Sequence, residues 1–280
     1  MTQAPRLTDR PALTLHRTRA QRRPELFLLR DVAADLEERL SEIKKPFTRP
    51  AIVGGLTAPF VEILPDAVVA PDSEALTLDP SAHDLVLHAM ALHWADDPVG
   101  QLVQSRLALE PDGLFLAVFF GGQTLNELRS VLAEAETRVM GGLSPRVLPM
   151  GDLRDLGGLL QRAGFALPVA DSRTITVRYR RLADLVRDLR GMGETNALVN
   201  RHRRPAPRLL FEVAENLYKK HFSDSEGYLT ATFEFVFLTG WAPDESQQKP
   251  LRPRSATARL ADALGTKERP TGDHTAPSKS

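Results

Sequence analysis

The chain has 280 residues, of which 42% are hydrophobic and 26% charged, and this is the composition of a globular protein rather than of a disordered chain. Its length allows one elaborated domain or two small ones. The 36 Lys and Arg residues balance the 36 Asp and Glu residues, so the formal net charge is zero. Because a general nucleic-acid binder has a basic excess, we expect no nucleic-acid partner.

The chain contains no cysteine, which excludes disulfides, thiolate metal sites, iron–sulfur clusters and a cysteine nucleophile. It has no run of about 18 apolar residues that could span a bilayer, and its N-terminus lacks the apolar core of a secretory signal. The sequence therefore predicts a soluble protein, and we favour the bacterial cytoplasm over the mitochondrial matrix. The oligomeric state is not predicted.

The charges are unevenly distributed along the chain. Residues 1–24 carry six Arg and one acid, whereas residues 51–100 carry eight acids and neither Lys nor Arg. The first segment resembles a mitochondrial presequence in composition, but Pro5, Pro11 and Pro24 would interrupt an amphipathic helix there. We therefore favour a basic N-terminal arm on the surface. An acidic lobe beside it suits either packing of the arm across the lobe or docking of an arginine-bearing partner.

The hydrophobic pattern predicts alternating helices and strands after the arm. Apolar residues recur at three-to-four spacing over residues 25–43, which indicates a helix. Continuous apolar runs at 51–53, 67–70, 84–88 and 114–120 predict buried strands, with a helix at 99–109 and a turn at 110–113. Fully apolar strands that alternate with helices are typical of a parallel sheet covered on both faces. Residues 25–122 are therefore interpreted as an α/β lobe.

The second half of the chain is mainly helical. Helical periodicity occurs at residues 124–139, 153–163, 182–190 and 209–222, and strand-like runs lie at 174–179 and 231–238. We interpret residues 123–241 as a helical cap that receives a substrate or partner. Residues 242–280 hold five Pro and are interpreted as an irregular tail that could include a short helix at 256–264.

Several candidate ligand contacts follow the predicted strands. Ligands of open parallel sheets bind outside the C-terminal ends of the strands, where helix N-termini present unpaired N–H groups. Such positions are Gly54 and Gly55 after the first strand, Asp72 after the second, His88 to His93 after the third, and Gly121-Gly122-Gln123-Thr124 after the fourth. Each alone is also a common turn or cap feature. We expect the four points to converge on one crevice.

Other residue patterns in the sequence predict neither a metal site nor a catalytic motif. His83, His88 and His93 recur every five residues, a spacing that brings three imidazoles together on neither a strand nor a helix, so no metal site is predicted. The basic run Arg201-His-Arg-Arg204 lacks interleaved aromatic residues and favours a solvated loop over a phosphate site. The sequence has no serine-nucleophile, phosphate-loop or zinc-protease motif.

Several runs resemble motifs of a known family. Asp84-Leu-Val86, Ala91-Leu-His-Trp94 and Pro111-Asp-Gly-Leu-Phe-Leu116 resemble the later motifs of class I S-adenosylmethionine-dependent methyltransferases. The runs at 121–129, 142–146, 155–165, 188–197 and 240–247 resemble a narrower group. That group contains a methyltransferase-fold assembly factor of respiratory complex I, which hydroxylates an arginine of an iron–sulfur subunit, and relatives of the biotin-pathway malonyl-carrier-protein methyltransferase. The resemblance implies a Rossmann-like α/β sheet with a helical cap and extra C-terminal strands.

The chain departs from that family at the cofactor lobe. The family opens its sheet with an acidic, glycine-rich loop and a second strand ending in the acid that holds the cofactor ribose. Here only residues 56–66 separate Gly55 from the run at 67–70, which resembles the family's third strand, and no acid lies beside residues 51–53. A strand–helix–strand unit needs about 30 residues, so the lobe is predicted to be truncated by one strand and one helix. We therefore expect the binding of S-adenosylmethionine to be weak or lost.

Two functions follow from this resemblance. One is a methyltransferase-like enzyme acting on a protein substrate, with arginine modification in complex I assembly as the implied reaction. The other is a non-catalytic assembly or scaffold factor. An open pocket at Gly54, Asp72 and His88 would favour the enzyme, whereas a pocket filled by side chains such as Phe60 would favour the scaffold.

The candidate contacts fall into two sets. The cofactor-binding candidates are Gly54, Gly55, Asp72 and His88, with Asp72 facing the adenine amine by resemblance; the substrate or partner candidates are Gln123, Thr124, Asn196 and Trp241. No catalytic residue is assigned, because methyl transfer needs mainly in-line positioning of the acceptor. Hydroxylation would need an oxidant, and no metal-ligand set stands out in the sequence.

Overall fold

The structure, a computed structural model, describes residues 6–247. Of these, residues 6–244 belong to one compact unit. Its helices are α1 (Arg10–Ala20), α2 (Phe27–Glu42), α3 (Ala58–Ile63), the 3-10 helix η1 (Leu92–Trp94), α4 (Pro98–Ala108), α5 (Asn126–Met140), α6 (Leu153–Arg162), α7 (Leu182–Gly191) and α8 (Arg208–Phe222). Its strands are β1 (Pro50–Gly54), β2 (Val68–Ala70), β3 (His83–Ala89), β4 (Leu109–Phe120), β5 (Ala166–Tyr179) and β6 (Leu229–Trp241).

The six strands form one sheet in the order β2-β1-β3-β4-β6-β5. The first four are parallel, and β6 runs antiparallel between β4 and β5. The common doubly wound sheet has two strands beyond its first strand on this side, whereas here only the three-residue β2 lies beyond β1. The fold is thus α/β, with a truncated Rossmann-like sheet and added C-terminal strands.

Every residue of β1 and β3 is buried, because helices cover both faces of the parallel part of the sheet. On one face, α2 and α3 pack through Leu36 and Phe60 in a cluster that also holds Ile52 of β1. On the other face, α4 and α6 pack in the cluster that contains Val53 of β1. Successive residues of β1 therefore enter different cores, as a pleated strand requires.

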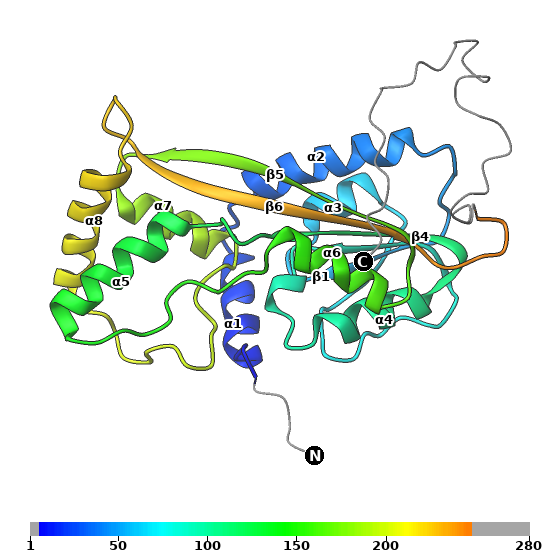
Figure 1. Ribbon diagram of the computed structural model, residues 1–280, viewed down its shortest axis with the longest axis horizontal. Helices are drawn as coiled ribbons and strands as arrows, with labels where there is room; N and C mark the ends of the chain where they lie inside the picture. The colour runs from blue at the N-terminus through cyan, green and yellow to red at the C-terminus, as the bar shows by residue number, and fades with distance from the viewer. Residues whose placement is uncertain (1–5, 248–280) are drawn as a thin grey trace, which may run out of the picture. The chain divides into compact units, whose positions relative to one another are not determined.

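The cap lies at the far end of the two long strands. Figure 1 shows α5, α7 and α8 gathered where β5 and β6 extend beyond the parallel strands, with α1 between this group and the rest of the sheet. Buried residues of all three cap helices share the cluster that covers one face of the sheet. The Tyr218 hydroxyl of α8 donates a 2.9 Å hydrogen bond to the Thr230 carbonyl of β6. The cap is therefore continuous with the core.

Three details differ from the sequence-based expectations. Pro11 does not interrupt a helix, because it lies in the first turn of α1, where its missing N–H has no helical partner to lose. The predicted turn at 110–113 is an irregularity inside β4. The pairing of β3 with β4 shifts its register there, because His83 pairs with Leu109 but Leu85 pairs with Leu114. The last two strands are longer than predicted.

The helix expected at 256–264 lies outside the described residues. Among the residues that the structure does describe, none of the helices has the length and apolar character needed to cross a membrane.

Candidate functional site

The ends of the parallel strands meet as the sequence predicts. β1 ends at Gly54 and β3 ends at Ala89. β2 and β3 lie on opposite sides of β1, so the topological switch point of the sheet lies at these strand ends. A Cβ atom on Gly54 would lie 2.6 Å from the Ala89 carbonyl oxygen. The two strands therefore approach too closely for a side chain at residue 54. Gly54, Asp72 and His88 converge on this edge.

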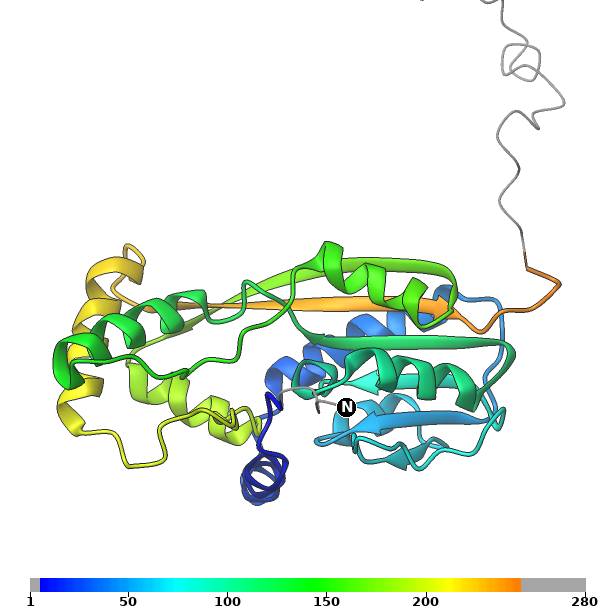
Figure 2. The ribbon, with the colours of Figure 1, turned by 60° about the horizontal axis from the view of Figure 1, so that its bottom comes forward.

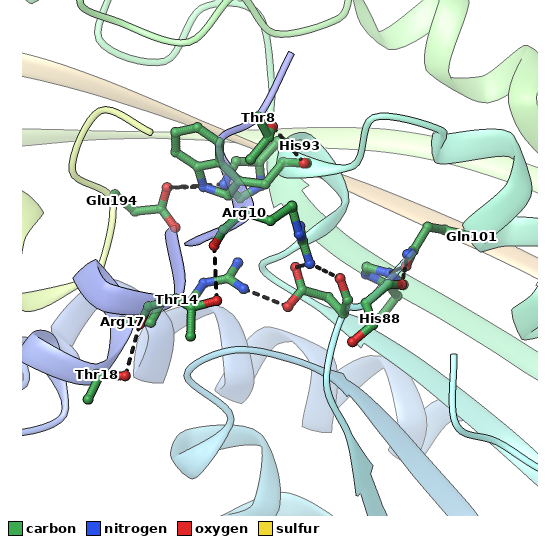
Figure 3. Close-up of polar contacts among 12 residues, drawn as sticks. Thr8, Arg10, Thr14, Arg17, Thr18, His88, His93, Gln101 and Glu194 are labelled. Carbon is green, nitrogen blue, oxygen red and sulfur yellow. Dashed lines mark hydrogen bonds and ion pairs between the residues drawn. The ribbon is translucent and has the colours of Figure 1, made fainter. Parts of the chain in front are cut away.

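The basic arm fills the space in front of this edge. Arg17 of α1 donates from Nη1 to Asp72 Oδ1 at 2.6 Å, and the Arg10 guanidinium lies 3.2 Å from Asp72 Oδ2 (Figure 3). Arg17 is only 8% exposed. A Cβ atom on Gly55 would lie 2.5 Å from Arg17 Cδ, so the arginine side chain runs directly over the glycine backbone. One buried carboxylate thus holds two arginines of the arm.

Contacts along its length hold α1 in place. Asp9 caps the helix by accepting a 3.1 Å hydrogen bond from the Ala12 N–H. The Thr8 hydroxyl donates to the Trp94 carbonyl at 2.9 Å, and the Asp9 N–H donates to the Ala197 carbonyl at 2.7 Å. Leu13 is buried in a cluster with Trp94 and Ala197. Figure 2 shows the helix, in dark blue, at the junction between the cap and the parallel strands.

His88 is fully buried behind Asp72. Its Nε2 atom donates to Gln101 Oε1 at 2.9 Å, and Gln101 in turn donates to the Ser73 carbonyl. Burial lowers the pKa of His88, because a charged imidazole is poorly solvated in the interior. His88 is therefore a neutral residue of the interior, and His83 and His93 have different partners, the Arg49 carbonyl and Glu194.

A small polar hollow lies beside Arg10. It has a volume of about 180 Å³ and is lined by the acidic side chains Asp72, Glu74, Asp96 and Asp97. Asp96 Oδ1 accepts hydrogen bonds from the backbone N–H groups of residues 7 and 8, and Asp97 caps α4. Asp72 is held by Arg10 and Arg17 and Glu74 lies 4.0 Å from Arg6, so each of the four carboxylates has a structural partner.

Two of the four predicted substrate or partner contacts line one cavity, and the other two lie elsewhere. Thr124 and Asn196 line a second, larger cavity in the cap. Gln123 is exposed, and its backbone N–H donates to Glu234 of β6. Trp241 pairs with Leu114 in the middle of β4, whereas Phe235 pairs with Phe120 at the end of the strand that faces the crevice. Trp241 is therefore not a crevice residue, and its role as a partner contact stays a prediction.

The cap cavity has a volume of about 250 Å³ and mainly apolar walls. Glu194 lies in it, in the loop after α7, and accepts hydrogen bonds at one oxygen, Oε2, from Trp94 Nε1 at 2.8 Å and from His93 Nε2 at 3.1 Å. Its neighbour Asn196 uses its amide within the fold, donating to the Pro145 carbonyl and accepting from the Leu198 N–H. Neither Arg17 nor Glu194 was singled out by sequence pattern.

The sequence of the chain is similar to those of two groups of known proteins. The chain is 37% identical over 204 residues to "Arginine-hydroxylase NDUFAF5, mitochondrial" of Danio rerio, which covers 71% of this chain and 62% of that protein. It is 33% identical over 177 residues to a malonyl-[acyl-carrier protein] O-methyltransferase of Laribacter hongkongensis, covering 63% of this chain and 57% of that protein. The chain thus spans less than two thirds of the length of either relative. No protein-family model matches it.

Among solved structures, the YcgJ protein of Bacillus subtilis is 12% identical and superimposes with a TM-score of 0.48 over 76% of this chain and 99% of that one.

The sequence matches confirm the resemblance of the chain to the class I methyltransferase-fold family. Within that family the chain is similar to the arginine hydroxylase NDUFAF5 and to the malonyl-[acyl-carrier protein] O-methyltransferases, the narrower group that its motifs resemble.

Proposed function

We propose that this chain is a methyltransferase-fold protein that acts in the assembly of respiratory complex I by binding an arginine-bearing subunit, and that it does so without S-adenosylmethionine. The observation that carries the proposal is the position of Arg17, which occupies the crevice between Gly55 and Asp72. The matches to the arginine hydroxylases supply the biological context.

The residues at the crevice do not fit the cofactor. Residues 51–53 have no acid beside them, and the space above Gly55 is taken by the arginine side chain. Asp72, the acid that resemblance places at the adenine, is paired with Arg10 and Arg17. A cofactor would have to break a buried ion pair, and removing one partner of such a pair costs about 3–5 kcal/mol.

The cap supports a role in recognition. It retains a cavity of about 250 Å³ beside the filled crevice, and its helices share the main core of the protein. A chain that had lost its cofactor site could still hold a partner in this cavity. The alternative, a methyltransferase-like enzyme that modifies the arginine, is an outcome of the tests below.

Where the protein acts follows from the same proposal. The arginine-hydroxylase relatives are named as mitochondrial, and the malonyl-[acyl-carrier protein] methyltransferases are bacterial. We place this chain in the compartment where complex I is assembled, which is the cytoplasm of a bacterium or the mitochondrial matrix of an organism with mitochondria.

Calorimetric titration of the purified protein with S-adenosylmethionine tests the loss of cofactor binding. We expect no saturable heat of binding for the wild type or for the Arg17→Ala variant. Removing the Arg17 side chain from the crevice does not supply the missing acid and strand. Arg19→Ala, an exposed change on the same helix, is the matched control. A low-micromolar dissociation constant for the wild type would overturn this part of the proposal.

Deletion of the gene tests the role in assembly. We expect less assembled complex I in the deletion strain while the corresponding subunit arginine keeps its hydroxyl group. Loss of the hydroxyl group together with the complex would favour the enzyme. Normal amounts of complex I would overturn the proposed role altogether.

A further inference from the structure

The cap cavity has the chemistry of a pocket for one long cationic side chain. An apolar cavity of about 150 Å³ accommodates a benzene molecule, so the observed 250 Å³ has room for a longer side chain. Its walls include the buried rings of Trp94 and Phe120 and several leucines, among them Leu128. These surfaces would cover the methylene stem of an arginine or lysine, which packs well on apolar groups.

One carboxylate oxygen in the cavity remains available to a ligand. Glu194 Oε2 accepts both hydrogen bonds, from Trp94 and from His93, while Oε1 has no hydrogen-bond partner within residues 6–247. The Glu194 side chain is 11% exposed. The indole and imidazole donors fix the carboxylate against the aromatic wall, so Oε1 is held where a cation could meet both a negative charge and a ring face.

The two arginines that line the cavity do not cancel this charge. Arg146 donates to Glu136 Oε1 at 2.7 Å, and Ser144 also donates to that carboxylate. Burial opposes ionisation of Glu136, but these hydrogen bonds outweigh it and hold the pKa of Glu136 below its usual range. Arg146 is therefore neutralised by its own partner.

The second arginine, Arg190, is exposed. It also lines a neighbouring hollow that carries Glu212 and Glu215, and this hollow shares Val186 and Phe211 with the cap cavity. Arg190 therefore also borders acidic side chains outside the cap cavity.

We infer that the cap cavity is the binding pocket for an arginine side chain of the partner protein, with Glu194 Oε1 pairing the guanidinium and Trp94 and Phe120 lying against its planar face. This inference rests on the proposed function and adds to it the site of recognition. A guanidinium suits the pocket better than an ammonium, because it is planar, stacks on aromatic rings and is more weakly hydrated.

Binding is measured with capped tripeptides, using the fluorescence of Trp94. The chain has two Trp residues, so a Trp241→Phe background leaves Trp94 as the single reporter. We expect the Gly-Arg-Gly peptide to bind more tightly than Gly-Lys-Gly and much more tightly than the citrulline peptide, which keeps the shape of arginine without its charge. Equal binding of the arginine and citrulline peptides, or no saturation at millimolar arginine peptide, would overturn the inference.

Two variants locate the binding in this cavity. Glu194→Gln keeps an acceptor for Trp94 but removes the charge, and we expect it to weaken arginine-peptide binding at least about tenfold, the effect of losing one charge-assisted hydrogen bond. Val186→Phe narrows the cavity without touching the carboxylate or adding a second tryptophan, and it should weaken binding as well. Glu37→Gln, an exposed change on α2, is the matched control and should bind normally.

The same variants separate this inference from the proposed function. If the deletion strain loses complex I and Glu194→Gln restores it fully, the role in assembly stands and the pocket is wrong. If the deletion has no effect while the peptide binds through Glu194, the pocket stands and the role in complex I assembly is wrong. Tighter binding of an apolar carboxylate such as benzoate than of the arginine peptide would also overturn the pocket assignment.

Discussion

Arg17 and Asp72 are 55 positions apart in sequence, yet Arg17 Nη1 donates to Asp72 Oδ1 at 2.6 Å in the buried crevice of the sheet. The pair joins the basic arm to the acidic lobe, two segments of opposite charge in a chain whose formal net charge is zero. Because the arm fills the crevice, the charge segregation has a structural role, which is to hold α1 against the ends of the parallel strands.

Replacing Arg17 by Met should destabilise the protein by about 3 kcal/mol, the lower part of the range for breaking a buried ion pair. The loss is at the lower end because Arg10 still faces Asp72. Urea unfolding measures the change, with Arg19→Met on the exposed side of α1 as the control, expected to change stability by less than about 0.5 kcal/mol. Equal effects of the two substitutions would contradict the structural role of the pair.

Replacing Gly55 by Ala should displace the Arg17 side chain and lower the free energy of unfolding by about 1–3 kcal/mol, as overpacking does. Gly142→Ala is the control, since no atom lies within 4 Å of the added Cβ. The decisive measurement is the double variant. In an Arg17→Ala background the penalty of Gly55→Ala should largely vanish, and an unchanged penalty would show that the methyl group meets something else.

The sequence predicted the core of the fold because its signals are local. The apolar runs at residues 51–53 and 84–88 became β1 and β3, and the parallel arrangement brought Gly54, Asp72 and His88 to one edge. The missing strand was predictable from chain length, since residues 56–66 cannot hold a full strand–helix–strand unit.

The side chains that fill the crevice and the cap cavity could not be predicted from local signals. The sequence suggests that Pro11 interrupts a helix, although a proline in the first turn favours one, and without α1 the partner of Asp72 has no predicted position. The segregation of charge was the available signal, and it left arm packing and partner docking as equal alternatives. Glu194 lies in a loop without periodicity, so its contacts with His93 and Trp94 appear only in three dimensions.

Asp84, which belongs to a methyltransferase-like motif, lies at the start of β3 and away from the crevice. Its carboxylate accepts hydrogen bonds from the Thr48 N–H at 2.6 Å, the Arg49 N–H at 3.0 Å and the Thr48 hydroxyl at 3.0 Å. Burial alone would raise the pKa of Asp84, but these hydrogen bonds outweigh it and the pKa is lowered. The stabilisation is therefore present above the unfolded pKa and is lost as the pH falls through the lower folded pKa.

Asp84→Asn should cost about 1–3 kcal/mol at neutral pH, and the difference from the wild type should narrow as the solution is acidified below the ordinary Asp pKa. Urea unfolding across this pH range measures the gap. Asp66→Asn, an exposed change on the same lobe, should leave stability unchanged at every pH. A gap that stays constant down to strongly acidic pH would mean that the charge of Asp84 is unimportant.

His88 should make the stability of the protein depend on pH near neutrality. Burial lowers the folded-state pKa of His88 below its model value of 6.5, while the charges of Asp72, His93 and Arg17 act on it in opposing directions. The unfolded chain therefore takes up a proton before the folded one does, so stability is present above about pH 6.5 and decreases as the pH falls below it. The slope contributed by one such group reaches about 1.4 kcal/mol per pH unit.

We expect His88→Asn to reduce the slope of unfolding free energy between neutral pH and pH 5, even if the variant is less stable at pH 7. His16, whose pKa is also lowered by burial, is left in place in both proteins, so the difference reports His88. His202→Gln, at an exposed position, should keep the wild-type slope. An NMR titration of the folded wild type gives an independent reading, and a His88 imidazole that protonates at its ordinary pKa would show that the buried site tolerates the charge.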